Sequence, residues 1–247
     1  MENKVLIIDN RMRKEEKEKL SNLGYKLIEI PKERNLYDEI SSHVDINCIK
    51  IGKSLILSKN IYDYMIGKLE KLKIKEKIEV KSLKKDLESK YPHDILMNVC
   101  ITKKYAIGNF KYVDDVVIKE IEKNNLIKIN VNQGYTKCSI AKLTENILIT
   151  NDEGIFNTIN NNYDDLKIYL IKEKSSIKLL NNDLNYSNMN GFIGGCITRI
   201  DDFVFISGDI NNFENSEKLK SIILKNNLKI VDLKDLDVID YGGIIQI

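Results

Sequence analysis

CSIAKLTENILITNDEGIFNTINNNYDDLKIYLI, residues 138–171, holds one complete copy of the structural unit that this chain repeats. Apolar side chains fill 138–143 and 146–150, which predicts two strands joined by a tight turn. Asp152 then occupies the N-cap position of a short helix, where its side chain can accept free backbone N–H groups of the first turn. A last apolar run, 166–171, predicts a third strand. The unit is therefore strand, strand, helix and strand.

The same order recurs in three further places and is shared between the two ends of the chain. The three further copies are expected at 45–51, 54–58, 61–69 and 77–81; at 95–101, 105–108, 114–123 and 126–131; and at 195–200, 203–207, a helix through 219–223, and 228–233. The N-terminus carries two strands and a helix, at 5–8, 12–23 and 25–30, without a first strand. Residues 244–247 at the other end supply the missing strand.

We therefore predict an α/β fold: a five-bladed, pseudo-symmetric α/β propeller over residues 1–247 as a single domain. The C-terminal strand would pair with the N-terminal unit, because closing the ring in this way leaves no sheet edge exposed. A generic α/β sheet with crossover helices is the competing interpretation, and the tight hairpin before every helix argues against it. Segments 81–90 and 174–190 are interpreted as connections between units.

Composition narrows the class of protein. Lys and Arg number 39 against 37 Asp and Glu, which gives a net charge of +2. A protein that binds nucleic acid or an anionic membrane normally carries a basic excess, so neither partner is expected. No apolar run approaches the roughly 18 residues that a membrane span needs, and the first residues do not form a signal-peptide core. We expect a cytoplasmic protein with reduced cysteines.

Polar and glycine-rich blocks stand beside the first strands of the units. They are His43-Val44-Asp45-Ile46, Tyr91-Pro92-His93-Asp94-Ile95 with Asn98, Gln133-Gly134-Tyr135-Thr136-Lys137-Cys138-Ser139, Gly191-Phe192-Ile193-Gly194-Gly195 and Tyr241-Gly242-Gly243-Ile244-Ile245. Together they resemble an uncharacterised bacterial family of the pentein fold, also called the guanidino-group-modifying enzyme fold. Arginine deiminase, agmatine deiminase, dimethylarginine dimethylaminohydrolase and glycine amidinotransferase share this fold, as does a non-catalytic ribosome anti-association factor.

For the hydrolases of this fold, the resemblance implies a cysteine thiolate that attacks the guanidinium carbon. A His-x-Asp element shuttles protons, and further carboxylates hold the substrate N–H groups. Those enzymes carry His-x-Asp late in the chain and the cysteine near the C-terminus. Here His43-Val44-Asp45 lies in the first complete unit, no histidine follows His93, and the last cysteine is Cys196.

Cys138 is the candidate nucleophile because an adjacent ammonium group, that of Lys137, can lower the pKa of its thiol. His43 is the candidate general acid and base. Asp45, the third candidate catalytic residue, is expected to share one face of a strand entry with His43 and, with Asp94, to anchor a cationic group. The candidate substrate-binding residues are His93, Asp94, Gln133, Lys137, Gly194 and Gly195. Cys196 remains an alternative reactive thiol.

The four cysteines, Cys48, Cys100, Cys138 and Cys196, are each expected on the first strand of a unit. No CxxC pair starts a metal site, so buried apolar cysteines are the expected state and no metal is predicted. The chain also lacks GxxxxGK[ST], GxGxxG, HExxH and GxSxG motifs, and no cofactor is expected.

Two functions follow from these residues. The first is an enzyme of the pentein type that acts on a small guanidino, amidino or amide compound through a cysteine nucleophile, as an amidine hydrolase or an amidinotransferase. The second is a non-catalytic pentein module that binds a protein or a small ligand. In both, a small-molecule ligand would sit at the channel mouth where the first strands begin. Substrate identity and oligomeric state stay open.

Overall fold

The computed structural model describes residues 4–172, 177–180 and 189–247, and these residues form an α/β fold of small sheets. Among them, five sheets have three strands and one has two. The three-stranded sheets join β17 (Ile245–Gln246), β1 (Val5–Asp9) and β2 (Lys26–Ile30); β3 (Cys48–Ile51), β4 (Ser54–Leu57) and β5 (Glu79–Ser82); β6 (Cys100–Ile101), β7 (Tyr105–Gly108) and β8 (Ile127–Asn130); β9 (Ile140–Thr144), β10 (Ile147–Thr150) and β11 (Lys167–Leu170); and β13 (Ile197–Ile200), β14 (Phe203–Ile206) and β15 (Lys229–Val231). The two-stranded sheet pairs β12 (Ile177–Lys178) with β16 (Val238–Ile239).

Every three-stranded sheet has the same strand connectivity. Its middle strand has an antiparallel partner on one side and a parallel partner on the other, as β4 has in β3 and β5. A helix connects the middle strand to the parallel one. These helices are α1 (Lys14–Asn22), α3 (Tyr62–Lys71), α4 (Asp115–Lys123), α5 (Glu153–Asn162) and α7 (Ser216–Lys225). The predicted order of strand, strand, helix and strand is therefore present in the structure.

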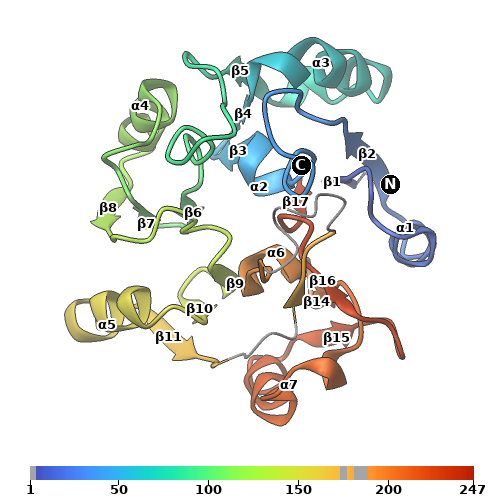
Figure 1. Cartoon of the computed structure of the whole chain (residues 1–247), viewed down its shortest axis with the longest axis vertical. Helices are drawn as coiled ribbons and strands as arrows, with labels where there is room; N and C mark the ends of the chain where they lie inside the picture. Colours follow the sequence, from blue (N-terminus) through green and yellow to red (C-terminus); the bar gives the residue numbers. More distant parts are fainter. Residues whose placement is uncertain (1–3, 173–176, 181–188) are drawn as a thin grey trace.

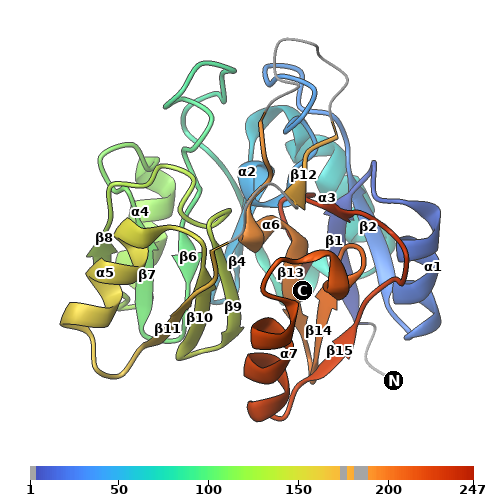
Figure 2. The same ribbon diagram turned by 60° about the horizontal axis from the view of Figure 1, so that its bottom comes forward.

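The first sheet is assembled from both ends of the chain. β17 pairs antiparallel with β1, with Leu6 opposite Gln246 and Ile7 opposite Ile245. β1 then pairs in parallel with β2. Figure 1 shows the five connecting helices at the periphery and the sheets inside them, with α2 (Val44–Asn47) and α6 (Ile193–Cys196) near the centre. In Figure 2 these two short helices lie toward the upper end of the strands.

The middle strands are buried along their whole length in β1, β4, β7 and β14, which explains their continuous apolar sequence. Neighbouring units share cores: Ile155 and Ile159 of α5 belong to one cluster with Leu148 of β10 and Ile107 of β7. Full burial of each such side chain contributes about 1.5–3 kcal/mol. The helix begins where expected, because the Asp152 side chain accepts a hydrogen bond from the backbone N of Ile155 at 2.8 Å.

Three first strands begin later than the sequence predicts, and a fourth is shorter. The strand predicted at 45–51 starts at Cys48, the one at 138–143 at Ile140 and the one at 195–200 at Ile197. Of the strand predicted at 95–101, only Cys100–Ile101 (β6) forms a strand. Cys138 and Cys196 therefore precede their strands, and the prediction that every cysteine lies on a first strand is wrong for these two.

For the strand predicted at 45–51, the cause is side-chain bonding to the backbone, which competes with strand pairing. The Nδ2 of Asn47 donates to the carbonyl oxygens of Ser41 and His43 at 3.0 and 2.9 Å and holds α2 as a helical turn. His43 is the residue before that turn, so it does not share a strand face with Asp45 as predicted. Of the connection expected at 174–190, residues 174–176 and 181–188 lie outside the described residues.

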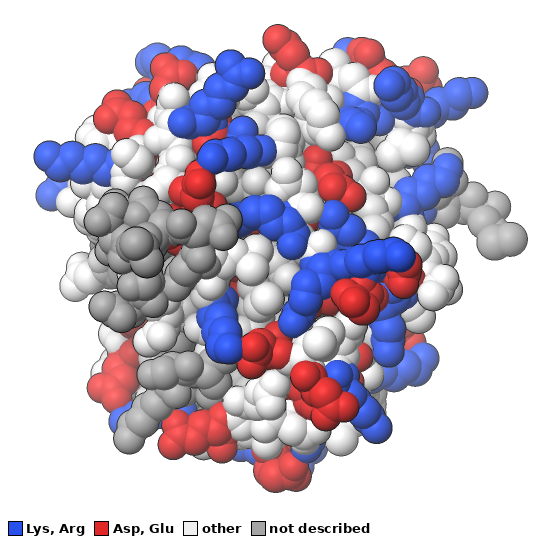
Figure 3. All heavy atoms as spheres, turned by 45° about the vertical axis from the view of Figure 1, so that its right-hand side comes forward, with Lys and Arg blue, Asp and Glu red and all other residues white. Residues whose placement is uncertain are grey.

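Within the described residues, no helix is long and apolar enough to cross a membrane. On the face in Figure 3, acidic and basic side chains alternate over short distances. Exposed pairs such as Lys229 with Asp202 at 2.7 Å occur on the surface. Pairs of this kind contribute about 0–1 kcal/mol each, so they account for little of the stability of the fold.

Candidate functional site

Asn98 holds together the segments that precede two first strands. Its Oδ1 accepts hydrogen bonds from the backbone N of Lys137 at 2.7 Å and of Cys138 at 3.2 Å. Its Nδ2 lies 3.0 Å from the Cys138 Sγ and 3.3 Å from the carbonyl oxygen of Asp45. This one buried amide therefore brings Asp45, from α2, beside Cys138, which lies about ninety residues further along the chain.

Cys138 and Asp45 form the buried centre of this cluster. Burial, together with the nearby carboxylates of Asp45 and Asp240, raises the pKa of the Cys138 thiol well above its usual value. Burial also raises the pKa of Asp45, and the Lys137 ammonium opposes that rise from 4.0 Å. Within the described part of the chain, neither oxygen of the Asp45 carboxyl group receives a hydrogen bond from a nitrogen or oxygen donor. The free site therefore holds a protonated thiol that hydrogen-bonds to a carboxyl group with few other donors.

Lys137 is the one member of the cluster with a clearly accessible side chain, 29% exposed. Its Nζ donates to the carbonyl oxygen of Gly194 at 3.0 Å. The backbone N of Gly194 in turn donates to the carbonyl oxygen of Cys138 at 2.7 Å. A Cβ on Gly194 would lie 2.4 Å from the carbonyl oxygen of Lys137, so only glycine lets α6 approach this loop.

Asp240 completes the cluster from the strand end before the C-terminus. Its carboxylate accepts hydrogen bonds from the backbone N of Phe192 and of Gly242, both at 2.8 Å. Burial nevertheless raises its pKa. A Cβ on Gly195 would lie 1.7 Å from the Asp240 Oδ1, so the carboxylate occupies the space that a side chain would need. Gly195 therefore acts by making room for Asp240.

His43 lies on the other side of Asp240. Its Nδ1 is 3.8 Å from the Asp240 Oδ1, and its Nε2 has no hydrogen-bond partner among the described residues. Burial lowers the pKa of His43 to about 4, partly offset by the nearby carboxylate of Asp9. The ring is therefore neutral at pH 7.

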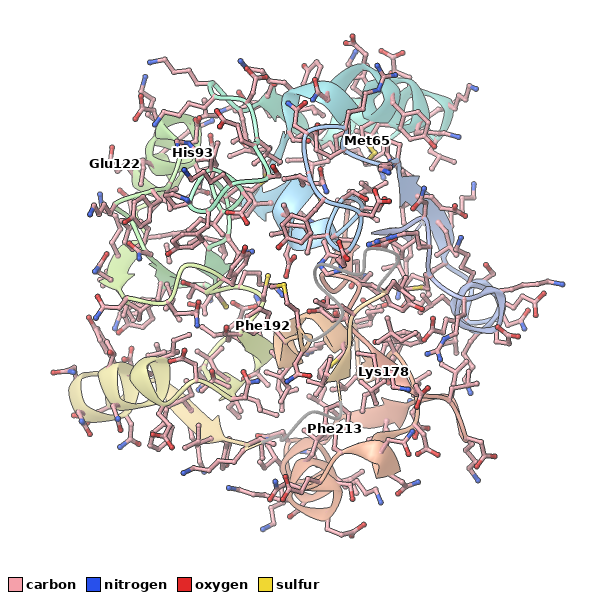
Figure 4. All side chains as sticks on the ribbon, viewed as in Figure 1. Met65, His93, Glu122, Lys178, Phe192 and Phe213 are labelled. Atoms are coloured by element: carbon pink, nitrogen blue, oxygen red, sulfur yellow. The ribbon has the colours of Figure 1, made fainter. Side chains whose placement is uncertain are left out.

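The structure gives the remaining predicted residues other surroundings. His93 is exposed, and Figure 4 shows it near α4 while Phe192 lies toward the centre. Asp94 is buried and accepts a short hydrogen bond from the Tyr135 hydroxyl group. Gln133 donates from Nε2 to the Asp152 Oδ2 at 2.9 Å, which ties it to the start of α5.

The cysteines pack separately. Cys48, Cys100, Cys138 and Cys196 are buried thiols outside any disulfide, and each belongs to a different apolar cluster. The Cys196 Sγ donates to the carbonyl oxygen of Ile193 at 3.4 Å within α6. Among the described residues, no three His, Cys, Asp or Glu side chains are grouped as metal ligands would be.

A cavity of about 800 Å³ reaches this cluster along the strands, and Asp45 and Lys137 are both in its lining. First strands contribute Cys48, Ile101, Lys142, Ile197 and Gln246, together with residues next to several of them. Segments far apart in the sequence therefore enclose one space, which is large enough for a small organic molecule.

A model of a family, described as a family of unknown function (DUF6873), matches residues 7–245. The chain belongs to this family. A comparison with curated proteins gave no match.

Solved structures of known enzymes share the fold. DDAH from Pseudomonas aeruginosa, a cysteine-to-serine mutant complexed with citrulline, has a TM-score of 0.56 at 10% identity over 99% of this chain and 98% of that chain. Agmatine deiminase of C. jejuni has 0.51 at 10% identity over 98% and 81%. Inosamine-phosphate amidinotransferase from Streptomyces griseus has 0.51 at 11% identity over 95% and 79%. These likenesses confirm the predicted pentein fold of this DUF6873 chain.

Sequence reasoning missed Asn98 and Asp240 as members of the cluster. Asn98 was named only as part of the stretch from Tyr91 that resembles the pentein family, and nothing in its neighbours distinguishes it from an ordinary loop residue. Asp240 precedes Tyr241-Gly242-Gly243, and that glycine pair was the available signal that the backbone there makes a close approach. Their roles depend on contacts between distant segments.

Proposed function

We propose that this chain is a pentein-type enzyme that acts on a small guanidino, amidino or amide compound, with Cys138 as the nucleophile. The observation that carries the proposal is the Asp45 carboxyl group, buried beside the Cys138 thiol without a nitrogen or oxygen donor. A buried carboxyl group whose main donor is a weak thiol is costly for the free protein. The N–H fork of a guanidinium or amidinium group would satisfy both of its oxygens at once.

Such a ligand would also activate the thiol. In the free protein the carboxylates of Asp45 and Asp240 oppose ionisation of Cys138. A cation bound between them cancels that field and lowers the pKa of the thiol, while the Asn98 amide already donates toward Sγ. The neutral ring of His43 is the proposed acceptor of the thiol proton.

The chemistry then balances as follows. The sulfur lone pair forms a C–S bond to the central carbon, and the electrons of the C=N bond move onto nitrogen. Protonation of one nitrogen by the imidazolium group of His43 lets that amine leave and regenerates the neutral ring. Water, or an acceptor amine in a transferase, then attacks the same carbon and releases the thiol of Cys138.

In this proposal Lys137, Gly194 and Gly195 shape the ligand site. Lys137 places a positive charge beside Asp45, and the two glycines allow α6 and Asp240 to approach. His93, Asp94 and Gln133, named from the sequence as substrate-binding residues, have other contacts and are left out. We also propose that the five three-stranded sheets form one closed ring and a single domain over residues 1–247, supported by the pairing of β17 with β1 and by the arrangement in Figure 1.

The test is turnover of a panel of guanidino, amidino and amide compounds, followed by detection of ammonia, ureido products or urea. We expect Cys138→Ala to abolish turnover. Cys100→Ala is the matched control, because Cys100 is equally buried but packs in a different cluster. Turnover retained by Cys138→Ala would exclude the covalent mechanism.

A binding module is the second candidate, and the burial and raised pKa of Cys138 are the observations that favour it. The two functions differ in how the thiol responds to a cation. For an enzyme, alkylation of Cys138 by iodoacetamide should be slow in the free protein and faster at a low concentration of an amidine such as acetamidine. Labelling that is slow with and without the amidine would favour the binding module.

A further inference from the structure

Three first strands place a basic side chain at the same register position. Lys50 of β3 pairs with Leu55, Lys142 of β9 pairs with Leu148, and Arg199 of β13 pairs with Val204. In each sheet, one further residue pair separates the pair with the basic residue from the hairpin turn. The three strands belong to different units, so the shared position comes from the repeat and not from local sequence.

All three side chains line the cavity of about 800 Å³ described above. They lie near the hairpin turns, at the opposite end of the first strands from α2 and α6, which Figure 2 places at the upper end. Lys103, in the turn between β6 and β7, lines the same cavity. We call Lys50, Lys142 and Arg199 the basic triad.

The acidic side chains of this end already have partners. Glu145 accepts from the Nζ of Lys142 at 2.9 Å, and Asp201 pairs with Lys4 at 2.6 Å. The Nζ of Lys50 donates to the carbonyl oxygen of Gln246 at 2.9 Å. In the described ranges, no carboxylate lies within 4.0 Å of the Lys50 ammonium group.

Arg199 is bonded in a similar way, to carbonyl oxygens. Its Nε donates to Asp201 O at 2.9 Å and its Nη1 to Leu143 O at 3.1 Å. Neutral acceptors orient the guanidinium group without cancelling its charge. Among the described residues, Lys50 and Arg199 therefore keep their positive charge without a carboxylate partner at this end of the cavity, whereas Glu145 balances the charge of Lys142.

Lys50 and Lys142, two members of the triad, are also close enough to repel one another. Burial lowers the pKa of Lys50, and the charge of Lys142 lowers it further. Like charges held on rigid strands beside a cavity cost free energy in the empty protein, and an anion between them removes that cost. Lysine and arginine side chains together suit a compact anion with several oxygens, because the guanidinium fork supplies directed donors and the ammonium groups supply point charge.

We propose that the basic triad binds a phosphate group, either inorganic phosphate or that of a small phosphorylated compound, in the hairpin end of the cavity. This site lies beyond the proposed function and does not require Cys138. Its ligand would enter from the hairpin end and would face Lys50, Lys142 and Arg199.

Titration calorimetry with inorganic phosphate at neutral pH and constant ionic strength tests the proposal, with chloride as the reference anion. The full chain should bind phosphate, and Lys50→Gln or Arg199→Gln should weaken binding at least about tenfold, as loss of one charge-assisted contact predicts. Lys119→Gln is the matched control, because Lys119 is exposed on α4, outside the cavity. It should change the Kd by less than about twofold.

Glycerol 3-phosphate in the same titration distinguishes the two sources of the group: tighter binding than inorganic phosphate identifies a phosphorylated compound. Circular dichroism checks the fold of each variant, and Lys142→Gln serves if Lys50→Gln does not fold. The proposal would be overturned if Lys50→Gln, Arg199→Gln and Lys142→Gln bound phosphate as tightly as the unmodified chain. It would also be overturned if neither phosphate nor glycerol 3-phosphate bound. Binding that persists in Cys138→Ala separates this site from the proposed enzyme activity.

Discussion

Replacing Gly195 by alanine would force Asp240 out of its position. The new Cβ would lie 1.7 Å from the Asp240 Oδ1 and 2.4 Å from its Cγ, so the carboxylate has to move. That carboxylate is held by the backbone N of Phe192 and of Gly242. Overpacking costs about 1–3 kcal/mol, and loss of one hydrogen bond to a charged group costs about 1.5–3 kcal/mol. We therefore expect Gly195→Ala to lower the free energy of unfolding by about 3–5 kcal/mol.

Urea unfolding followed by circular dichroism measures this loss. With an m-value of about 3 kcal/mol/M, the midpoint should fall by about 1–1.7 M. Gly67→Ala is the matched control, because Gly67 lies within α3 and a Cβ there meets nothing within 4 Å. That substitution should stabilise the protein by up to about 1 kcal/mol, the difference in helix propensity.

A double-mutant cycle isolates the cause. Asp240→Ala removes the carboxylate, so in that background Gly195→Ala should cost less than about 1 kcal/mol. The two substitutions should therefore show a coupling free energy of about 2–4 kcal/mol. If their effects simply add, the contact between Asp240 and Gly195 does not limit stability, and our account of this glycine is wrong.

Two further predictions concern the chain end and the buried carboxyl group. Deleting residues 242–247 removes the buried Ile244 and two hydrogen bonds, from Gly243 N to Gly195 O and from Ile247 N to Val5 O. The free energy of unfolding should fall by at least about 4 kcal/mol. An unchanged Tm would exclude a closed ring. Because the pKa of Asp45 is raised in the folded chain, its contribution to stability is fully present below about pH 4 and is lost as pH rises through the raised pKa. Asp45→Asn should therefore stabilise the protein more at about pH 8 than at about pH 5 in thermal melts, and a gain independent of pH would contradict the raised pKa.

The amino-acid sequence by itself determined the local elements of this protein. Apolar runs such as 147–150 become middle strands because both of their faces are covered, and Asp152 starts a helix because its side chain bonds within the same turn. These interactions span a few residues, and they repeat, so periodicity alone predicts them. The C-terminal strand was also predictable, because one unit lacked a first strand.

Only the tertiary structure decided which side chains from distant segments are in contact. Asn98 joins Asp45 to Cys138, Asp240 fills the space beside Gly195, and the raised pKa of Cys138 reverses the activation expected from its neighbour Lys137. The sequence predicted Cys138, Lys137 and Gly194 near one another, but it did not place His93 on the surface. Burial and distance between remote segments set these properties, and neither is encoded in the spacing of residues along the chain.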